Sequence, residues 1–304
     1  MTDIKRFEEF ADDVREAMAL RYPDDKVELK RVTKNNGVIY TGISVRNEDE
    51  RVYPTLYLEP FFEECGEAPL DDEMVDRICG IYESRRIGSV PELDFLSDYE
   101  CVRKNLRCKL INYKSNEEFL KDVPCRKFMD LAIVPYYRIK DCDLGKSIMS
   151  EGSFVIRKGH LDMWKVSADS LISESIRNTF TMENPVITGI YEVLKKMNPA
   201  FEQTIPQEAQ AAPMYVMTTD GAGGAVSMLY EEKIGEFCDS IDSDVYIVPS
   251  SVNEVILVPK KGCIPENMLN EMVREVNATE LQPVDVLSDH VYYFDRDEGY
   301  RMAV

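Results

Sequence analysis

The triplet Asn35-Asn36-Gly37 constrains the fold of this chain more than any other short stretch. It lies between two runs rich in β-branched residues, at 27–32 and 38–45. Asn and Gly adopt, at low cost, the positive φ angles that a tight hairpin turn requires. The two runs are therefore predicted to pair as an antiparallel hairpin.

Helical patterns occur on both sides of this hairpin. Apolar residues at intervals of three and four predict one helix over residues 4–22 and another over 71–83. Ser167 and Thr188 are suitable N-caps for two further helices. The remaining β-rich runs cover residues 55–58, 107–113 and 131–137.

The composition of the chain changes over residues 198–213, which contain three prolines and no periodic pattern of apolar residues. Such a stretch is typical of a linker or a long surface loop. We therefore predict an N-terminal α+β domain over 1–197, a linker or long loop over 198–213, and a C-terminal α+β domain over 214–304.

The C-terminal part is predicted to be a largely antiparallel sheet with helices on one face. Strands at 214–218 and 226–229 flank a glycine-rich turn, and a hairpin joins 245–248 to 254–258. A helix that begins near Pro265 is expected to pack an apolar stripe against this hairpin. The stripe consists of Met268, Leu269, Met272, Val273 and Val276. The predicted fold class is α+β, a two-part protein with largely antiparallel sheets flanked by helices.

The chain is strongly acidic, with 36 Lys and Arg against 56 Asp and Glu, for a net charge of −20. This charge opposes binding to nucleic-acid backbones and to anionic membrane surfaces, so we expect neither as a partner. The sequence also has no apolar run of about 18 residues, the length that a membrane-spanning helix needs. An acidic chain could act as a nucleic-acid mimic, but the carboxylates are spread over every segment instead of forming dense rows.

Eight cysteines are present, and none forms a C-x-x-C pair. Zinc-ribbon and thioredoxin-type sites are therefore excluded by spacing. Several cysteines interrupt apolar patterns, as small buried hydrophobic residues do in a reducing compartment. We expect cysteine thiols, a cytoplasmic location, and neither a metal ion nor a cofactor.

Eight short sequence strings, distributed over almost the whole chain, are similar to those of a known protein family. They lie at residues 34–37, 53–58, 122–124, 130–134, 160–164, 247–257, 273–279 and 287–293. The longest is Ile-Val-Pro-Ser-Ser-Val-Asn-Glu-Val-Ile-Leu at 247–257. Together they resemble a bacterial family named domain of unknown function 5688. The order of segments is more distantly similar to domain of unknown function 1444. Neither resemblance implies a reaction, a cofactor or a catalytic residue.

Two short stretches contain residues that could carry out chemistry. His160 and Asp162 lie two positions apart, so the carboxylate could orient the imidazole as a general base if both were on one strand face. Trp164, the only tryptophan, follows them and could contribute to binding. Asp289 and His290 are a second carboxylate–imidazole pair that could act in catalysis. We favour a structural role for both stretches, because isolated His residues are common without catalysis.

Two predicted turns are candidate binding sites. The glycine-rich turn 220–225 lacks the helix that a phosphate-binding loop opens, so a flexible turn is the better interpretation. The predicted hairpin turn carries the polar residues Ser250, Ser251, Asn253 and Glu254. Polar loops between apolar strands often hold binding residues, although such side chains also satisfy turn backbone groups.

No catalytic motif is visible, and a G-x-S-x-G elbow is absent from the sequence. The sequence therefore favours a cytoplasmic binding or regulatory protein that acts through protein contacts. A hydrolase-like enzyme with a site assembled from dispersed residues is the second hypothesis. An acidic inhibitor or nucleic-acid mimic is the third.

Overall fold

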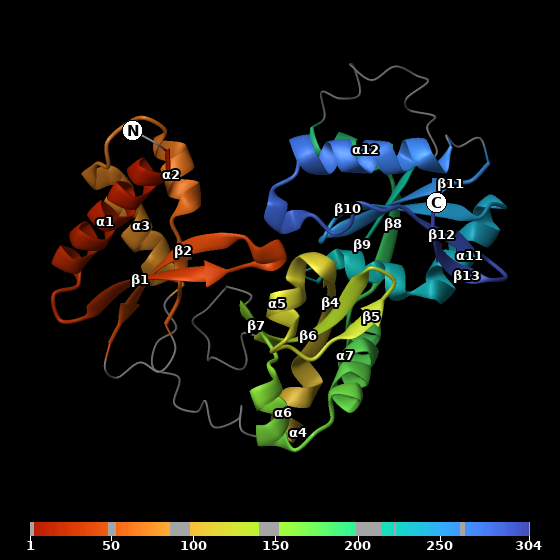
Figure 1. The fold of residues 1–304 in the computed structure, drawn as a ribbon, viewed down its shortest axis with the longest axis horizontal. Coiled ribbons are helices and arrows are strands. Elements are labelled where there is room, and N and C mark those ends of the chain that lie inside the picture. The colour runs from red at the N-terminus through yellow and green to blue at the C-terminus, as the bar shows by residue number, and fades with distance from the viewer. Residues whose placement is uncertain are drawn as a thin grey trace. The chain divides into compact units, whose positions relative to one another are not determined.

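The computed structural model describes residues 3–47, 53–85, 98–139, 152–198, 214–221, 223–261 and 265–303. The chain forms two compact units (Figure 1). Unit 1 comprises residues 1–101 and 138–153, and unit 2 comprises residues 102–137 and 154–304. Of the helices that the described ranges contain, none has both the length and the apolar surface needed to cross a membrane.

The division into units falls in a different place from the predicted boundary at 198–213. Apart from Asn198, that segment lies outside the described residues. The strands on either side of it, Pro185–Gly189 (β8) and Tyr215–Thr219 (β9), pair with each other in one antiparallel sheet. Because a shared ladder and a shared core join these strands, residues 154–198 and 214–304 belong to the same unit.

Unit 1 consists of a three-stranded antiparallel sheet in the order β1-β2-β3, with helices packed on one face. The elements are α1 (Asp3–Arg21), β1 (Lys26–Thr33), β2 (Ile39–Arg46), β3 (Leu56–Tyr57), α2 (Glu59–Cys65) and α3 (Asp72–Ser84). A short helix, α4 (Tyr99–Val102), follows at the junction between the units. The predicted helices at 4–22 and 71–83 are thus confirmed to within one residue at each end.

The predicted hairpin is also confirmed. β1 and β2 pair from Lys26↔Arg46 to Thr33↔Ile39. Asn36 and Gly37 have φ angles of 58° and 73°, the left-handed conformations that the turn requires. The fully buried core beneath the sheet includes Val14 and Met18 of α1 and Ile43 of β2.

Unit 2 contains two sheets. In the four-stranded sheet, β4 (Leu106–Asn112) and β5 (Arg126–Phe128) flank β6 (Leu131–Ile139), and β7 (Gly152–Val155) also pairs with β6. The six-stranded antiparallel sheet has the order β13-β12-β10-β11-β9-β8. Its remaining strands are β10 (Val245–Ser251), β11 (Glu254–Pro259), β12 (Tyr292–Asp295) and β13 (Gly299–Met302). Within the described residues, the α-helices of this unit are α5 (Glu117–Leu120), α6 (Lys158–Trp164), α7 (Ala168–Met182), α8 (Ile190–Met197), α11 (Glu231–Ile241) and α12 (Glu266–Thr279).

Helices cover both faces of the six-stranded sheet, not the single face predicted from the sequence. Val245 and Ile247 point into a core shared with α11, whereas Tyr246 packs with α12 on the opposite face. Figure 1 shows α12 lying along the sheet. The strand alternation therefore buries β10 on both sides. The α+β class and the antiparallel sheets flanked by helices are confirmed.

The apolar stripe of α12 is only partly buried, which corrects the packing expected from the sequence. Leu269 and Val273 face the sheet and are 6% and 5% exposed. Met268, Met272 and Val276 are 48%, 52% and 45% exposed. Met268 and Met272 each precede a buried residue by one position, which is about 100° around the helix, so their side chains lie beside the buried arc.

The segment after the glycine-rich turn is a 3-10 helix, Gly224–Leu229, where a strand was predicted. It is buried almost throughout and packs against β9 and β11. A Cβ at Gly224 would lie 2.4 Å from the carbonyl oxygen of Asn253. The turn is therefore a close-packed structural feature in which glycine is required for backbone approach.

Candidate functional site

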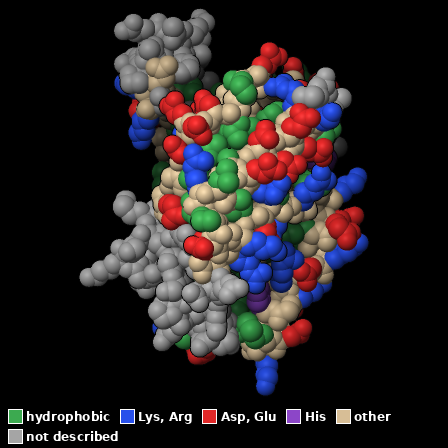
Figure 2. All heavy atoms as spheres, turned by 90° about the vertical axis from the view of Figure 1, so that its left-hand side faces the viewer, with side chains coloured by type: hydrophobic (Ala, Val, Ile, Leu, Met, Phe, Trp, Pro, Cys, Tyr) green, Lys and Arg blue, Asp and Glu red, His purple; other side chains and the backbone are tan. Residues whose placement is uncertain are grey.

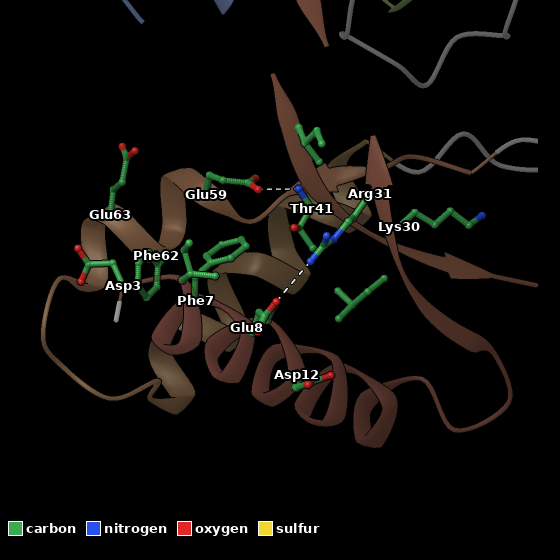
Figure 3. Close-up of a pocket in the computed structure, with 14 residues that line it drawn as sticks. Asp3, Phe7, Glu8, Asp12, Lys30, Arg31, Thr41, Glu59, Phe62 and Glu63 are labelled. Carbon is green, nitrogen blue, oxygen red and sulfur yellow. Dashed lines mark hydrogen bonds and ion pairs between the residues drawn. The ribbon is translucent and has the colours of Figure 1, made fainter. Parts of the chain in front are cut away.

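A surface groove in unit 1 has a volume of about 710 Å³ (Figure 3). It lies between α1, α2 and the β1–β2 hairpin. Ligand-binding clefts commonly have volumes of about 300–1,000 Å³. We refer to this cavity as the groove and take it as the candidate site.

The floor of the groove is apolar. It is formed by Ile4, Phe7, Ala11, Leu29, Ile39 and Phe62. Ile4 and Ile39 are 74% and 58% exposed, although Ala11 beside them is buried. Exposed β-branched apolar side chains of this kind beside a concave surface are typical of binding sites.

The groove exists because the hairpin extends beyond the part that the helices cover. Odd-numbered residues of β2 point to the core, and Ile43 and Val45 are fully buried there. Thr41 and Ile39 continue on the same face toward the turn, where they line the groove instead of the core. The strand alternation thus leaves an apolar surface without a cover from α1.

Charged side chains form the rim of the groove, and most are acidic. The carboxylates are Asp3, Glu8, Asp12, Glu59 and Glu63, and the cations are Lys30 and Arg31. Figure 3 shows Glu8 reaching from α1 toward Arg31 of β1, and these two side chains form an ion pair of 3.3 Å. Carboxylates outnumber cations, so the groove has a negative potential that favours cationic ligands.

Glu59 connects the rim to the sheet. Its Oε1 accepts a hydrogen bond of 2.5 Å from the backbone N–H of Thr41. The other oxygen, Oε2, is buried and has no hydrogen-bond partner within the described structure. Glu59 thereby connects α2 to β2 at the wall of the groove.

The sequence candidates His160, Asp162 and Trp164 lie on α6 in unit 2, where they do not form a catalytic pair. Residues two apart on a helix are separated by about 200°, so Asp162 points away from His160. The Nδ1 of His160 accepts a hydrogen bond from the backbone N–H of Arg157, and its ring stacks on Trp164. Burial and the neighbouring Arg157 charge lower the pKa of His160. The expected strand geometry is therefore corrected to a helix with a capping histidine.

The other histidine, His290, lies beside a carboxylate that the sequence did not suggest. Its Nδ1 is 3.3 Å from Oδ2 of Asp130, which also accepts a hydrogen bond of 2.7 Å from the hydroxyl of Ser288. Tyr292 donates a hydrogen bond of 2.7 Å to the other oxygen of the same carboxylate. The candidate Asp289 instead accepts a hydrogen bond from Asn277.

This cluster resembles a Ser-His-Asp triad in composition but not in connectivity. In a triad the serine hydroxyl bonds to the imidazole, and the carboxylate bonds to the far side of the ring. Here Ser288 is fully buried and donates directly to Asp130. Burial and the Asp130 charge raise the pKa of Tyr292, which keeps its hydroxyl protonated as a donor. The cluster therefore organises the segment before β12 and leaves Ser288 unable to act as a nucleophile.

The polar hairpin turn is less open than the sequence suggested. Ser251 is 8% exposed and pairs with Glu254, so the loop is only Val252 and Asn253. The hydroxyl of Ser251 accepts a hydrogen bond from the Asn253 N–H, and Ser250 interacts with Glu254 at 3.4 Å. The hydrogen bonds of these side chains are therefore made within the turn itself.

The described ranges contain no group of three His, Cys, Asp or Glu side chains able to hold a metal ion. The six cysteines within those ranges are thiols, and Cys142 and Cys263 lie outside them.

A model of a family of unknown function (DUF5688) matches residues 7–296 of the chain. This match confirms the resemblance inferred from the eight strings. Neither a curated protein nor a solved structure matches the chain.

Proposed function

The chain belongs to the family of unknown function DUF5688, and from this premise we propose that it is a binding protein that acts through protein contacts made at the groove. The observation that carries the proposal is the exposed apolar floor, with Ile4 and Ile39 at its surface. Covering such side chains contributes about 1.5–3 kcal/mol each when burial is complete. A partner that covers both would gain up to about 3–6 kcal/mol toward the entropic cost of association.

The chemistry of the rim specifies the partner. Five carboxylates against two cations favour a segment with Lys or Arg beside its apolar residues. An amphipathic helix that places its apolar face into a groove is a common recognition mode with these properties. The proposed ligand is therefore a basic amphipathic segment of another protein, and the proposed location is the cytoplasm, in keeping with the cysteine thiols.

The proposal is tested with a fluorescein-labelled peptide of leucine and lysine, with the leucines at helical spacing. Ile39→Lys places a cation on the floor of the groove and should weaken binding by about tenfold or more, measured as fluorescence anisotropy. Leu20→Lys is the matched control, because Leu20 is 83% exposed on α1 and lies outside the groove. Equal loss in both variants, or no loss in either, would refute the groove as the binding site.

A second peptide isolates the contribution of charge. A peptide with the same leucine pattern and glutamate in place of lysine should bind more weakly, because the acidic rim repels it. If both peptides bind equally, the acidic rim does not select the partner.

One observation favours an enzyme as the second candidate function. The Asp130 carboxylate bonds to Nδ1 of His290, whose side chain is 45% exposed, so the imidazole could act as a general base. His290→Gln should then abolish hydrolysis of ester or phosphoester substrates without changing the unfolding curve. An absence of hydrolysis by the unmodified protein would remove this candidate.

The third hypothesis, an acidic mimic, requires carboxylates in continuous rows. On the face shown in Figure 2, Asp and Glu side chains are mixed with Lys and Arg. This distribution gives the mimic no support on that face.

A further inference from the structure

A part of unit 2 has the opposite charge to the rest of the chain. Residues 103–137 and 154–165 contain eleven Lys and Arg against five Asp and Glu, although the whole chain has a net charge of −20. Salt screens exposed charges beyond about 8 Å at physiological ionic strength, so a local excess of cations acts largely on its own. This region can attract anions despite the acidity of the molecule.

Contacts bring the exposed cations of this region together around α5 and the start of α6. Lys158 donates from Nζ to the carbonyl oxygen of Lys121 at 2.7 Å, and its backbone N–H bonds to the carbonyl oxygen of Asp122. Lys127 lies over the ring of Tyr113, which directly precedes Lys114. The side chains that form this surface, named the basic face, are Lys114, Lys121, Lys127, Arg157 and Lys158.

The cations of the basic face are accessible. Lys121 and Arg157 are 70% and 56% exposed at their side chains. Figure 2 shows Lys and Arg side chains gathered next to a histidine on the face that it presents. Exposed, clustered cations of this kind provide an electrostatic footprint for an anionic partner.

Carboxylates within the same surface define the type of anion. Glu118 forms an ion pair with Lys121, and Asp122 forms one with Arg157. The exposed Glu117 of α5 is a third carboxylate near Lys121. A continuous phosphate backbone would pass these carboxylates at short range and be repelled, and it would require an extended row of cations. A short segment with a few separated carboxylates can instead contact the cations and avoid the acidic positions.

We propose that the basic face binds a short acidic segment of a partner protein. This inference is independent of the groove, which selects the opposite charge in the other unit. The carboxylates of the partner would compete with Glu118 and Asp122 for Lys121 and Arg157. Because such exposed pairs are individually weak, the exchange costs little, and the additional cations make the contact favourable.

The chain contains a natural probe for this contact. Trp164 is its only tryptophan, and its ring stacks on His160 with centroids 5.3 Å apart. His160 in turn accepts a hydrogen bond from the backbone of Arg157. Binding at Arg157 should therefore change the tryptophan emission, which links the measured signal to the basic face.

The test uses the full chain and a synthetic peptide of glutamate and serine, which lacks aromatic residues. Titration should change the emission of Trp164 and give an affinity that falls steeply as salt is added. The variant Lys121→Gln/Arg157→Gln/Lys158→Gln should bind the peptide about tenfold more weakly or worse.

The matched control removes three cations elsewhere, as Lys26→Gln/Lys233→Gln/Lys261→Gln. These lysines are 72%, 52% and 67% exposed and also form surface ion pairs. The control should retain the affinity within about twofold, since distant surface changes act independently. Circular dichroism checks that each variant is folded, and Lys121→Gln alone serves if the triple variant is not.

Three results would overturn the proposal. The first is an equal loss of affinity in the control variant. The second is the absence of any salt-sensitive change in Trp164 emission. The third is tighter binding of oligothymidylate, or of vesicles containing phosphatidylserine, than of the acidic peptide, which would assign the face to nucleic acid or to lipid.

Discussion

Two adjacent residues of α12 provide a sharp test of how this helix packs. Val273 is 5% exposed and contacts the sheet, whereas Met272 next to it is 52% exposed. Substituting aspartate at each position introduces the same charge into the same helix. We expect Val273→Asp to unfold or strongly destabilise unit 2, and Met272→Asp to be tolerated.

The magnitudes follow from burial. Val273→Asp loses about 1.5–3 kcal/mol of apolar burial. It also places a carboxylate among Tyr246, Leu269 and Tyr293, and a buried polar group without a partner costs a further 1–3 kcal/mol or so. Met272→Asp removes only the buried half of one side chain and should cost about 1 kcal/mol or less. The difference between the variants should be at least about 1.5 kcal/mol, which is more than about tenfold in the unfolding equilibrium.

The assay is urea unfolding followed by tryptophan fluorescence. Trp164 belongs to unit 2, as α12 does, so its emission reports on the unit that carries the substitutions. Equal midpoints for the two variants would show that α12 does not face the sheet through Val273. A larger loss for Met272→Asp would show that the helix is rotated.

Three further predictions concern local packing and titration. Gly224→Ala should destabilise unit 2 by about 1–3 kcal/mol or more in the same unfolding assay, because the added Cβ would lie 2.4 Å from the Asn253 carbonyl oxygen. An unchanged unfolding midpoint would contradict the close packing of the turn. Burial raises the pKa of the Cys108 thiol to about 12, so iodoacetamide at pH 8 should modify the exposed Cys101 well before Cys108, as peptide mass spectrometry would show; equal rates would refute this. The pKa of His160 in the folded state is lowered below its usual 6.5, so the unfolded chain binds the proton more readily. The free energy of unfolding should therefore fall as the pH drops below about 6.5. His160→Gln should reduce this pH dependence, and an identical pH profile would exclude the histidine as its source.

Features encoded by neighbouring residues were predictable from the sequence. The Asn-Gly turn favours positive φ angles locally, so the pairing of β1 with β2 in a hairpin was predictable. The apolar period of α1 likewise identified the helix, and Val14 and Met18 are fully buried. In both cases the physical cause lies within a few residues of the effect.

Features that depend on distant residues were not predictable. Asp130 and His290 are separated by 160 positions, and no local pattern signals their contact. The apolar stripe of α12 predicted which residues could be buried, but the sheet beneath covers only part of that arc. The groove was missed for the same reason. An apolar residue such as Ile39 cannot be distinguished from a core residue until the elements that pack on its side of the sheet are known.

The central claim, that the groove is a binding site for a basic amphipathic segment, is tested most directly by methyl NMR. Ile4 and Ile39 both have side chains on the exposed floor, so their δ1 methyl groups should report contact with a ligand. On titration with the leucine–lysine peptide, these two methyl signals should shift together and saturate, while that of the buried Ile247 in unit 2 stays in place. Unchanged signals from Ile4 and Ile39 in the presence of bound peptide would contradict the account.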